Sequence, residues 1–140
     1  MAAGSHAAAT PDHIHPRPSP PLSPTTMSRD RLFLLEPGFT DAARPGERFV
    51  CPDCLPIEGL LAADPARAAR LEIVRVPFAR PRAAVAAVLG PDNQGLPVLV
   101  LDGDAAPPAD AHVHGVLRFV TDTRRILDLL AERHGFPRVH

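Results

Sequence analysis

Three residue types that often carry a function are missing from this 140-residue chain. It has no lysine, tryptophan or tyrosine, so all 15 basic residues are arginine. The absence of lysine excludes a lysine Schiff base and the lysine of a phosphate-binding loop. The absence of tryptophan excludes a tryptophan platform on which nucleic-acid bases could stack.

Excess charge and long hydrophobic runs are missing as well. Sixteen acidic residues nearly balance the arginines, which gives a formal net charge of -1. This balance provides no electrostatic basis for binding nucleic acid or an anionic membrane. No apolar run approaches the roughly 20 residues that span a bilayer. We expect a single domain, because a chain of this length forms one modest core. We expect the protein to be cytoplasmic.

The first 26 residues differ in composition from the rest. They hold six of the 18 prolines and few large apolar side chains. Such a segment cannot offset the entropy lost on ordering, so we expect a disordered tail at residues 1–26 and a domain at residues 27–140. The tail lacks the apolar stretch of a secretory signal. Met27 is an alternative start, in which case residues 1–26 would not be translated.

From residue 31 onwards, strand and helix signals alternate. Apolar and β-branched runs predict strands at residues 31–35, 71–76, 96–101 and 113–120. Apolar residues at helical spacing predict a helix around Leu55–Leu61, a second around Val85–Leu89, and a third from Thr121 or Asp122 to Gly135. The expected order of elements is β-α-β-α-β-β-α.

This order predicts an α/β fold with a four-stranded mixed sheet and helices on both faces. Each helix between two strands predicts a right-handed crossover and parallel pairing of those strands. The linker between the third and fourth strands is rich in proline, alanine and aspartate and has no helical period. We therefore expect that last pair to be antiparallel.

The only two cysteines form the motif Cys51-Pro52-Asp53-Cys54, directly before the first predicted helix. Unpaired N–H groups and the helix dipole place partial positive charge there, which stabilises a thiolate. Reactive cysteines occur in such positions. We therefore predict that Cys51 attacks a disulfide and that Cys54 resolves the mixed disulfide that results.

Four neighbouring residues modify this environment. Arg48, three residues before Cys51, would favour a thiolate or hold an anionic group of a substrate. Asp53 opposes ionisation if its carboxylate points inward. Pro52 suits the first turn of a helix, whereas Pro56 would crowd the carbonyl of Pro52, so we expect a distorted first turn.

The cysteine pair has two alternative interpretations. It is half of a metal site if His112 and His114, which share one face of a strand, provide two further ligands for zinc or an iron–sulfur cluster. In the other alternative, the thiols are incidental and the domain is a non-catalytic binding module. A structural disulfide is disfavoured, because so short a loop gives little stabilisation and no secretory signal is present.

The arrangement resembles the thioredoxin-like fold, in its glutaredoxin branch. The likeness covers about residues 30–135: a strand, a C-x-x-C motif that opens a helix, and a later strand entered through Leu96-Pro97. The string from RLFLLEPGF to LAERHGFP also resembles a small bacterial family of thioredoxin-like proteins with no assigned function. The resemblance implies a thiol–disulfide oxidoreductase that needs no bound cofactor.

The resemblance also implies the substrate-binding positions. A cis Leu96-Pro97 bond would face Cys51 and leave the backbone of Leu96 free to pair with a thiol peptide. Arg48 matches the cationic residue that glutaredoxins place three positions before the first cysteine. The place where glutaredoxins bind the γ-glutamyl end of glutathione is occupied by Thr121, Asp122 and Thr123. These three residues also suit ordinary helix capping.

The implied partner is a thiol or disulfide, carried by a protein or by glutathione as co-substrate. Three features differ from glutaredoxins and concern glutathione specificity rather than the fold. The loop before Cys51 is longer, at about fifteen residues. An aromatic residue in or just before the motif and the double glycine before the last helix are missing. The sequence leaves the oligomeric state open.

Overall fold

The computed structural model describes residue 4 and residues 29–102 and 105–140. The predicted tail, residues 1–26, lies outside the described residues except for Gly4. No helix in the described ranges is long and apolar enough to cross a membrane. The elements in chain order are β1 (Arg31–Leu35), α1 (Leu55–Ala63), α2 (Pro65–Ala68), β2 (Glu72–Val76), α3 (Ala83–Leu89), β3 (Val98–Val100), β4 (His112–His114), β5 (Leu117–Val120) and α4 (Thr123–His134).

The strands form one mixed sheet in the order β2-β1-β3-β5-β4. β1 and β2 are parallel, as predicted for two strands joined by a helix. β3 is antiparallel to β1, and β5 is antiparallel to β3. The antiparallel pairing predicted for the last two strand segments is therefore confirmed for β3 and β5.

Two predictions about the sheet are wrong. The strands before and after α3 were predicted to be parallel, but β2 and β3 run in opposite directions. The reason is that β3 begins at the end of the sheet where β2 finishes. The loops on either side of α3 are long enough to return the chain to that same end. The fourth predicted strand is two strands, β4 and β5, so the sheet formed by the described residues has five strands rather than four.

Gly115 explains the extra strand. It adopts a φ of +59° in the two-residue turn between β4 and β5, a conformation that glycine reaches at little cost. Its neighbour Val116 is 94% exposed at the tip of the turn. The continuous apolar run from residue 113 to 120 therefore folds back on itself as a hairpin.

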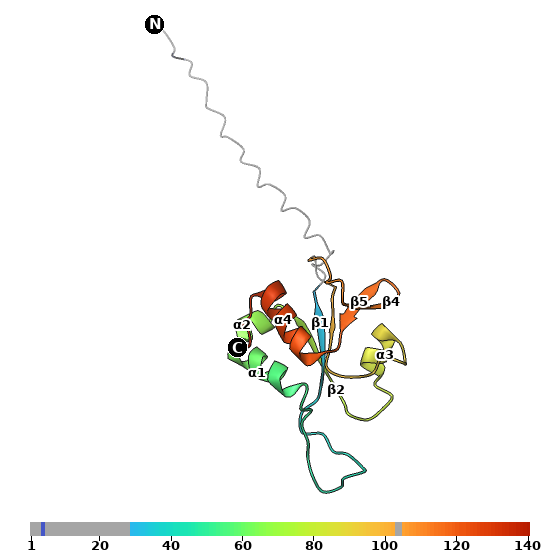
Figure 1. Cartoon of the computed structure of the whole chain (residues 1–140). Helices are drawn as coiled ribbons and strands as arrows, with labels where there is room; N and C mark the ends of the chain where they lie inside the picture. The colour runs from blue at the N-terminus through green and yellow to red at the C-terminus, as the bar shows by residue number, and fades with distance from the viewer. Residues whose placement is uncertain (1–3, 5–28, 103–104) are drawn as a thin grey trace.

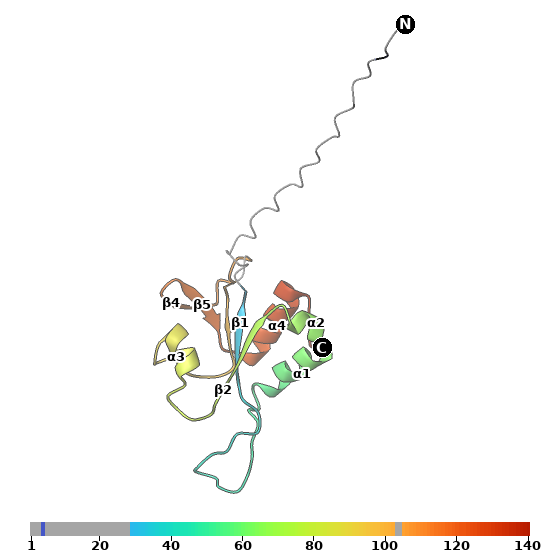
Figure 2. The same ribbon diagram turned by 180° about the vertical axis from the view of Figure 1, so that it is seen from behind.

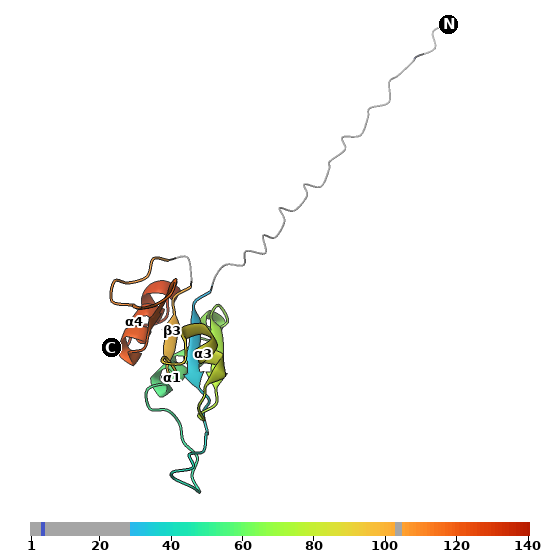
Figure 3. The same cartoon turned by 90° about the vertical axis from the view of Figure 1, so that its right-hand side faces the viewer.

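The helices cover both faces of the sheet, as predicted. α1 and α4 lie on one face and α3 on the other (Figures 1 and 3). Because side chains alternate along a strand, Leu32 and Leu34 belong to the buried cluster under α1 and α4, whereas Phe33 belongs to the cluster under α3. β1 is thus buried on both faces and forms the centre of the core.

The last helix begins and ends at the predicted residues. The Asp122 carboxylate accepts the N–H of Arg125 at 2.9 Å and caps the helix. Gly135 ends it with a φ of +75°. The short helix α2 was not predicted. It begins at Pro65 after Asp64, whose side chain accepts the N–H of Arg67.

A buried ion cluster joins α4 to the start of β1. The Asp30 side chain is 0% exposed and accepts hydrogen bonds from Nε of Arg133 at 2.8 Å and Nη2 at 3.1 Å. His134 Nε2 lies 2.7 Å from the same carboxylate, and the N–H of Asp102 donates to it at 3.0 Å. This cluster lies at the opposite end of β1 from the cysteine motif.

We predict that Asp30→Asn lowers the free energy of unfolding by about 3–5 kcal/mol, because Arg133 would remain buried without its charge partner. Urea unfolding measures the loss. The matched control is Asp102→Asn, whose side chain is 44% exposed and 3.6 Å from Arg31. That change should cost less than about 1 kcal/mol. Equal losses in the two variants would contradict the prediction.

Candidate functional site

The residues of the predicted site lie at one end of the sheet. β1, β2 and β5 run in one direction and β3 in the other, so three strands end where β3 begins. The loop that leaves β1 leads to α1, and the chain that leaves β5 leads directly to α4. The segment between β1 and α1 projects from this end of the sheet (Figures 1 and 2).

The cysteine motif is a turn that leads into α1. The carbonyl of Cys51 accepts the N–H of Leu55 at 3.0 Å, and Cys54 is the N-cap residue. Pro52 therefore precedes the helix rather than lying in its first turn. The expected conflict with Pro56 does not arise, because Pro56 is the second helical residue and its missing N–H falls among the unpaired groups of the first turn.

The two cysteines differ in burial. Their side chains lie 3.3 Å apart and are not bonded, whereas a disulfide would bring the sulfurs to about 2.05 Å. Cys51 is partly exposed, and Cys54 is only 2% exposed. The Sγ atom of Cys51 accepts the N–H of Cys54 at 3.4 Å. The Sγ atom of Cys54 accepts the N–H of Leu35, at the end of β1, also at 3.4 Å.

Burial holds Cys54 in its neutral form. It raises the pKa of the Cys54 thiol from 9.0 to about 12. The hydrogen bond from Leu35 acts in the opposite direction, while the nearby Cys51 and Glu58 raise the pKa further. Cys54 is thus a protonated thiol at neutral pH.

A small hollow of about 60 Å³ lies against both sulfur-bearing residues. Val50 and Leu55 line it, and they are 48% and 54% exposed. Pro37 and Glu58 also contribute to its wall. Cys51 is therefore approachable from solvent beside exposed apolar side chains.

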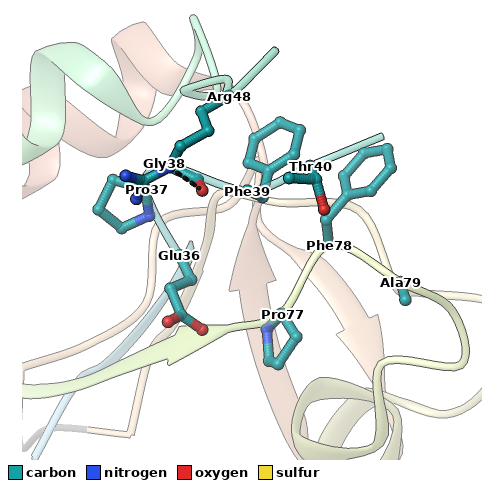
Figure 4. Close-up of a pocket in the computed structure, with 9 residues that line it drawn as sticks. All are labelled: Glu36, Pro37, Gly38, Phe39, Thr40, Arg48, Pro77, Phe78 and Ala79. Carbon is teal, nitrogen blue, oxygen red and sulfur yellow. Dashed lines mark hydrogen bonds between the residues drawn. The ribbon is translucent and has the colours of Figure 1, made fainter. Parts of the chain in front are cut away.

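Arg48 lies across the loop that follows β1. Its Nε donates to the carbonyl of Gly38 at 3.1 Å. Gly38 has a φ of +77°, and a Cβ atom there would collide with the guanidinium. Figure 4 shows Arg48 beside Gly38, at the edge of a hollow of about 370 Å³ that also contains Phe39 and Phe78.

The other predicted substrate-binding residues lie at the same end of the sheet. The Leu96-Pro97 bond is cis, as the resemblance implied. Leu96 packs against both buried clusters, one of which includes Cys54. The Thr123 hydroxyl donates to the carbonyl of Asp53 at 2.9 Å, so the start of α4 contacts the cysteine motif.

The two residues before Thr123 have different surroundings. Asp122 caps α4 through its bond to Arg125, which is the capping role considered for it. Thr121 lines a separate hollow of about 270 Å³ together with Asn93 and Phe119. Of the three predicted residues at the helix start, it is Thr123 that bonds to the motif.

The two histidines of the proposed metal site lie elsewhere. His112 and His114 are on β4, the edge strand three strands away from β1. The His112 ring packs against Phe119, and His114 lies beside Gly90. Within the described part of the chain, no three His, Cys, Asp or Glu side chains are grouped to hold a metal. The alternative that joins them to the cysteines is therefore wrong.

Arg82 was not predicted from the sequence. This arginine is only 8% exposed. Its Nε donates to the carbonyl of Phe78 at 3.0 Å and its Nη1 to the carbonyl of Gln94 at 2.9 Å. Its guanidinium lies 5.5 Å from the centre of the Phe78 ring. No local pattern marks it, because the burial of an arginine depends on distant segments.

Arg82 also interacts electrostatically with the cysteine pair. Burial lowers the pKa of Arg82, and negative charge on Cys51 or Cys54 opposes that shift. In the described structure its side chain makes no ion pair with a carboxylate. A thiolate at the motif would therefore face a buried positive charge.

Comparison with known proteins gives one match. Residues 29–138 match DUF3088, described as a protein of unknown function. No curated protein and no solved structure gives a significant match. Because the matched residues make up most of the chain, this protein belongs to the DUF3088 family.

Proposed function

We propose that this protein is a thiol–disulfide oxidoreductase in which Cys51 attacks a disulfide and Cys54 resolves the product. The observation that carries the proposal is the unequal burial of two unbonded, adjacent thiols. Cys51 is partly exposed, while Cys54 lies behind it and is 2% exposed. A foreign sulfur can reach the first thiol, and the second is already within reach of the bond that would form.

The fold that we propose for this chemistry is thioredoxin-like, of the glutaredoxin branch. Support comes from the first strand, the C-x-x-C turn at the start of α1, and the mixed sheet with helices on both faces. The cis Leu96-Pro97 bond at the entry to β3 agrees with the same assignment. The contact of Thr123 with Asp53 adds the start of the last helix to the site.

The reaction has two displacement steps. The Cys51 thiolate attacks one sulfur of a disulfide RSSR, a Cys51–SR bond forms, and the first RS⁻ leaves and takes up a proton. The Cys54 thiol then loses its proton and attacks the Cys51 sulfur, which releases the second RS⁻. Two electrons pass from the protein to RSSR, giving two RSH and a Cys51–Cys54 disulfide. A thiol reductant, such as two glutathione molecules, reverses this oxidation.

The surroundings favour this division of roles. Negative charge on Cys51 would be stabilised by the N–H of Cys54 and by the buried charge of Arg82. The raised pKa of Cys54 keeps that thiol protonated during the first step. Cys51 is therefore the nucleophile, and Cys54 ionises only when it resolves the mixed disulfide.

The proposal predicts one reversible two-electron transition when the reduced protein is titrated with a glutathione redox buffer. Mass spectrometry after thiol trapping measures the Cys51–Cys54 disulfide. Cys51→Ser should abolish disulfide reduction, whereas Cys54→Ser should trap a mixed disulfide on Cys51. Full activity in Cys51→Ser, or no reversible transition in the wild type, would sink the proposal and favour the binding module.

Unequal thiol reactivity is a second expected outcome. In single-cysteine variants at pH 7, iodoacetamide should label Cys51 of Cys54→Ser at least about tenfold faster than Cys54 of Cys51→Ser. Burial and a pKa of about 12 leave almost no thiolate on Cys54. Labelling after unfolding in urea is the control and should proceed at similar rates. Similar rates in the folded variants would contradict the assigned roles.

The raised pKa of Cys54 also predicts a loss of stability at high pH. The unfolded chain releases this proton near pH 9.0 and the folded chain near pH 12. The stabilising contribution is complete below pH 9 and declines above it by up to about 1.4 kcal/mol per pH unit. Lysine and tyrosine, which normally titrate here, are absent.

Urea unfolding from pH 8 to pH 10.5 under reducing conditions measures this effect. The wild type should lose more stability over this range than Cys54→Ala, which lacks the titrating thiol. Identical pH dependence in the two proteins would show that the folded state does not hold Cys54 in its neutral form.

A further inference from the structure

The hollow of about 370 Å³ that Arg48 lines has no role in the proposed two-step reaction. It lies where β1 and β2 end, between the segment that starts at Glu36 and the segment that starts at Pro77 (Figure 4). Pro37 lines both this hollow and the small hollow against Cys51. The two hollows are therefore neighbours that share Pro37, and Cys51 lines the smaller one.

Two opposite charges line the hollow without neutralising each other. Arg48 is exposed, and in the described part of the chain its side chain makes one hydrogen bond, to Gly38. Glu36 is also exposed, and its carboxylate forms no ion pair with any described residue. Figure 4 shows the guanidinium and the carboxylate at separate places around the hollow. A complementary ligand therefore carries both a carboxylate and an ammonium group.

Two aromatic side chains, each held in place by neighbouring residues, form another part of the wall. The rings of Phe39 and Phe78 stack with centroids 4.5 Å apart and 7° between their planes. Phe39 pairs with Phe49 through backbone hydrogen bonds of 2.8 and 3.1 Å, and Arg82 bonds to the carbonyl of Phe78. Both rings keep part of their surface exposed. Such a wall suits the methylene and sulfur atoms of a small disulfide, since sulfur contacts aromatic rings favourably.

We propose that this hollow binds an amino-acid disulfide, of which cystine is the simplest, and so selects small zwitterionic disulfides as substrates. Arg48 would hold the carboxylate through paired N–H groups, as guanidinium groups do. Glu36 would attract the ammonium group, and the sulfur atoms would lie towards Cys51. This inference rests on the proposed function, because the hollow provides specificity and the two thiols provide the electrons.

The reaction with cystine balances in the same way as the general one. Cys51 forms a mixed disulfide with one cysteine and the cystine S–S bond breaks, releasing the other cysteine. Cys54 then displaces the bound cysteine. The protein loses two electrons and becomes the Cys51–Cys54 disulfide, while one cystine becomes two cysteines. A dithiol reductant restores the protein for the next cycle.

Single-turnover rates test this specificity without a competing reductant. Pre-reduced protein is mixed with cystine or with the neutral hydroxyethyl disulfide, and its oxidation is followed by thiol trapping. Arg48→Gln should lower the second-order rate constant for cystine about tenfold or more, because a charge-assisted pair of hydrogen bonds is lost. Glu36→Gln should lower it to a smaller extent. With hydroxyethyl disulfide, which has no charged group to bind, each change should lower the rate constant clearly less than it does with cystine.

Matched controls come from the same loop. Arg44→Gln and Glu47→Gln remove the same charges from exposed residues that do not line the hollow. Both variants should keep both rate constants within about twofold of the wild type. An equal fall with both disulfides in Arg48→Gln would mean that Arg48 acts on the thiol chemistry, and would overturn the proposal. Glutathione disulfide is a third arm, and a loss confined to it would overturn the assignment to amino-acid disulfides.

A binding measurement separates failure of the hollow from failure of the proposed function. The redox-inactive double variant Cys51→Ser/Cys54→Ser is titrated with S-methylcysteine, which carries the same charged groups but cannot exchange thiols. Chemical-shift changes in NMR spectra at Phe39 and Phe78 are expected, and Arg48→Gln in that background should remove them. No shifts at millimolar concentrations would overturn the binding site even if the dithiol is active.

Discussion

The sulfur of Cys54 lies against the last residue of β1, where it accepts the N–H of Leu35. This contact anchors the start of α1 to the central strand and leaves Cys54 2% exposed. The same burial raises its pKa and leaves Cys51 as the accessible member of the pair. The roles that we propose for the two thiols therefore depend on how the start of α1 packs against β1.

Positive charge at this end of the sheet comes from arginine alone, since the chain has no lysine. Arg82 lies inside, within electrostatic reach of the thiols, and Arg48 lies outside, beside the larger hollow. In the proposed reaction, the inner charge would face a thiolate formed at the motif, and the outer one would attract a carboxylate of the substrate.

Local signals were sufficient for most elements of the fold. The apolar run at residues 31–35 became β1, Gly90 ended α3, and Asp122 and Gly135 bounded α4. Local signals failed where one segment fitted two different local structures equally well. The run at residues 113–120 is apolar enough for one strand, but Gly115 permits a turn that makes it a hairpin. The predicted direction of β3 was wrong for a different reason. The lengths of the loops around α3 do not determine at which end of the sheet the chain returns.

The sequence by itself determined which thiols are available and that they precede a helix, because motif spacing and capping act over a few residues. Only the tertiary structure decided that Cys54 is buried, that Thr123 rather than Asp122 bonds to the motif, and that the histidines lie across the sheet. It also decided that Arg82 is buried and that the segments after β1 and β2 line a charged hollow. Each of these features joins residues from separate segments, and their distance in space follows from packing of the whole core rather than from any local pattern.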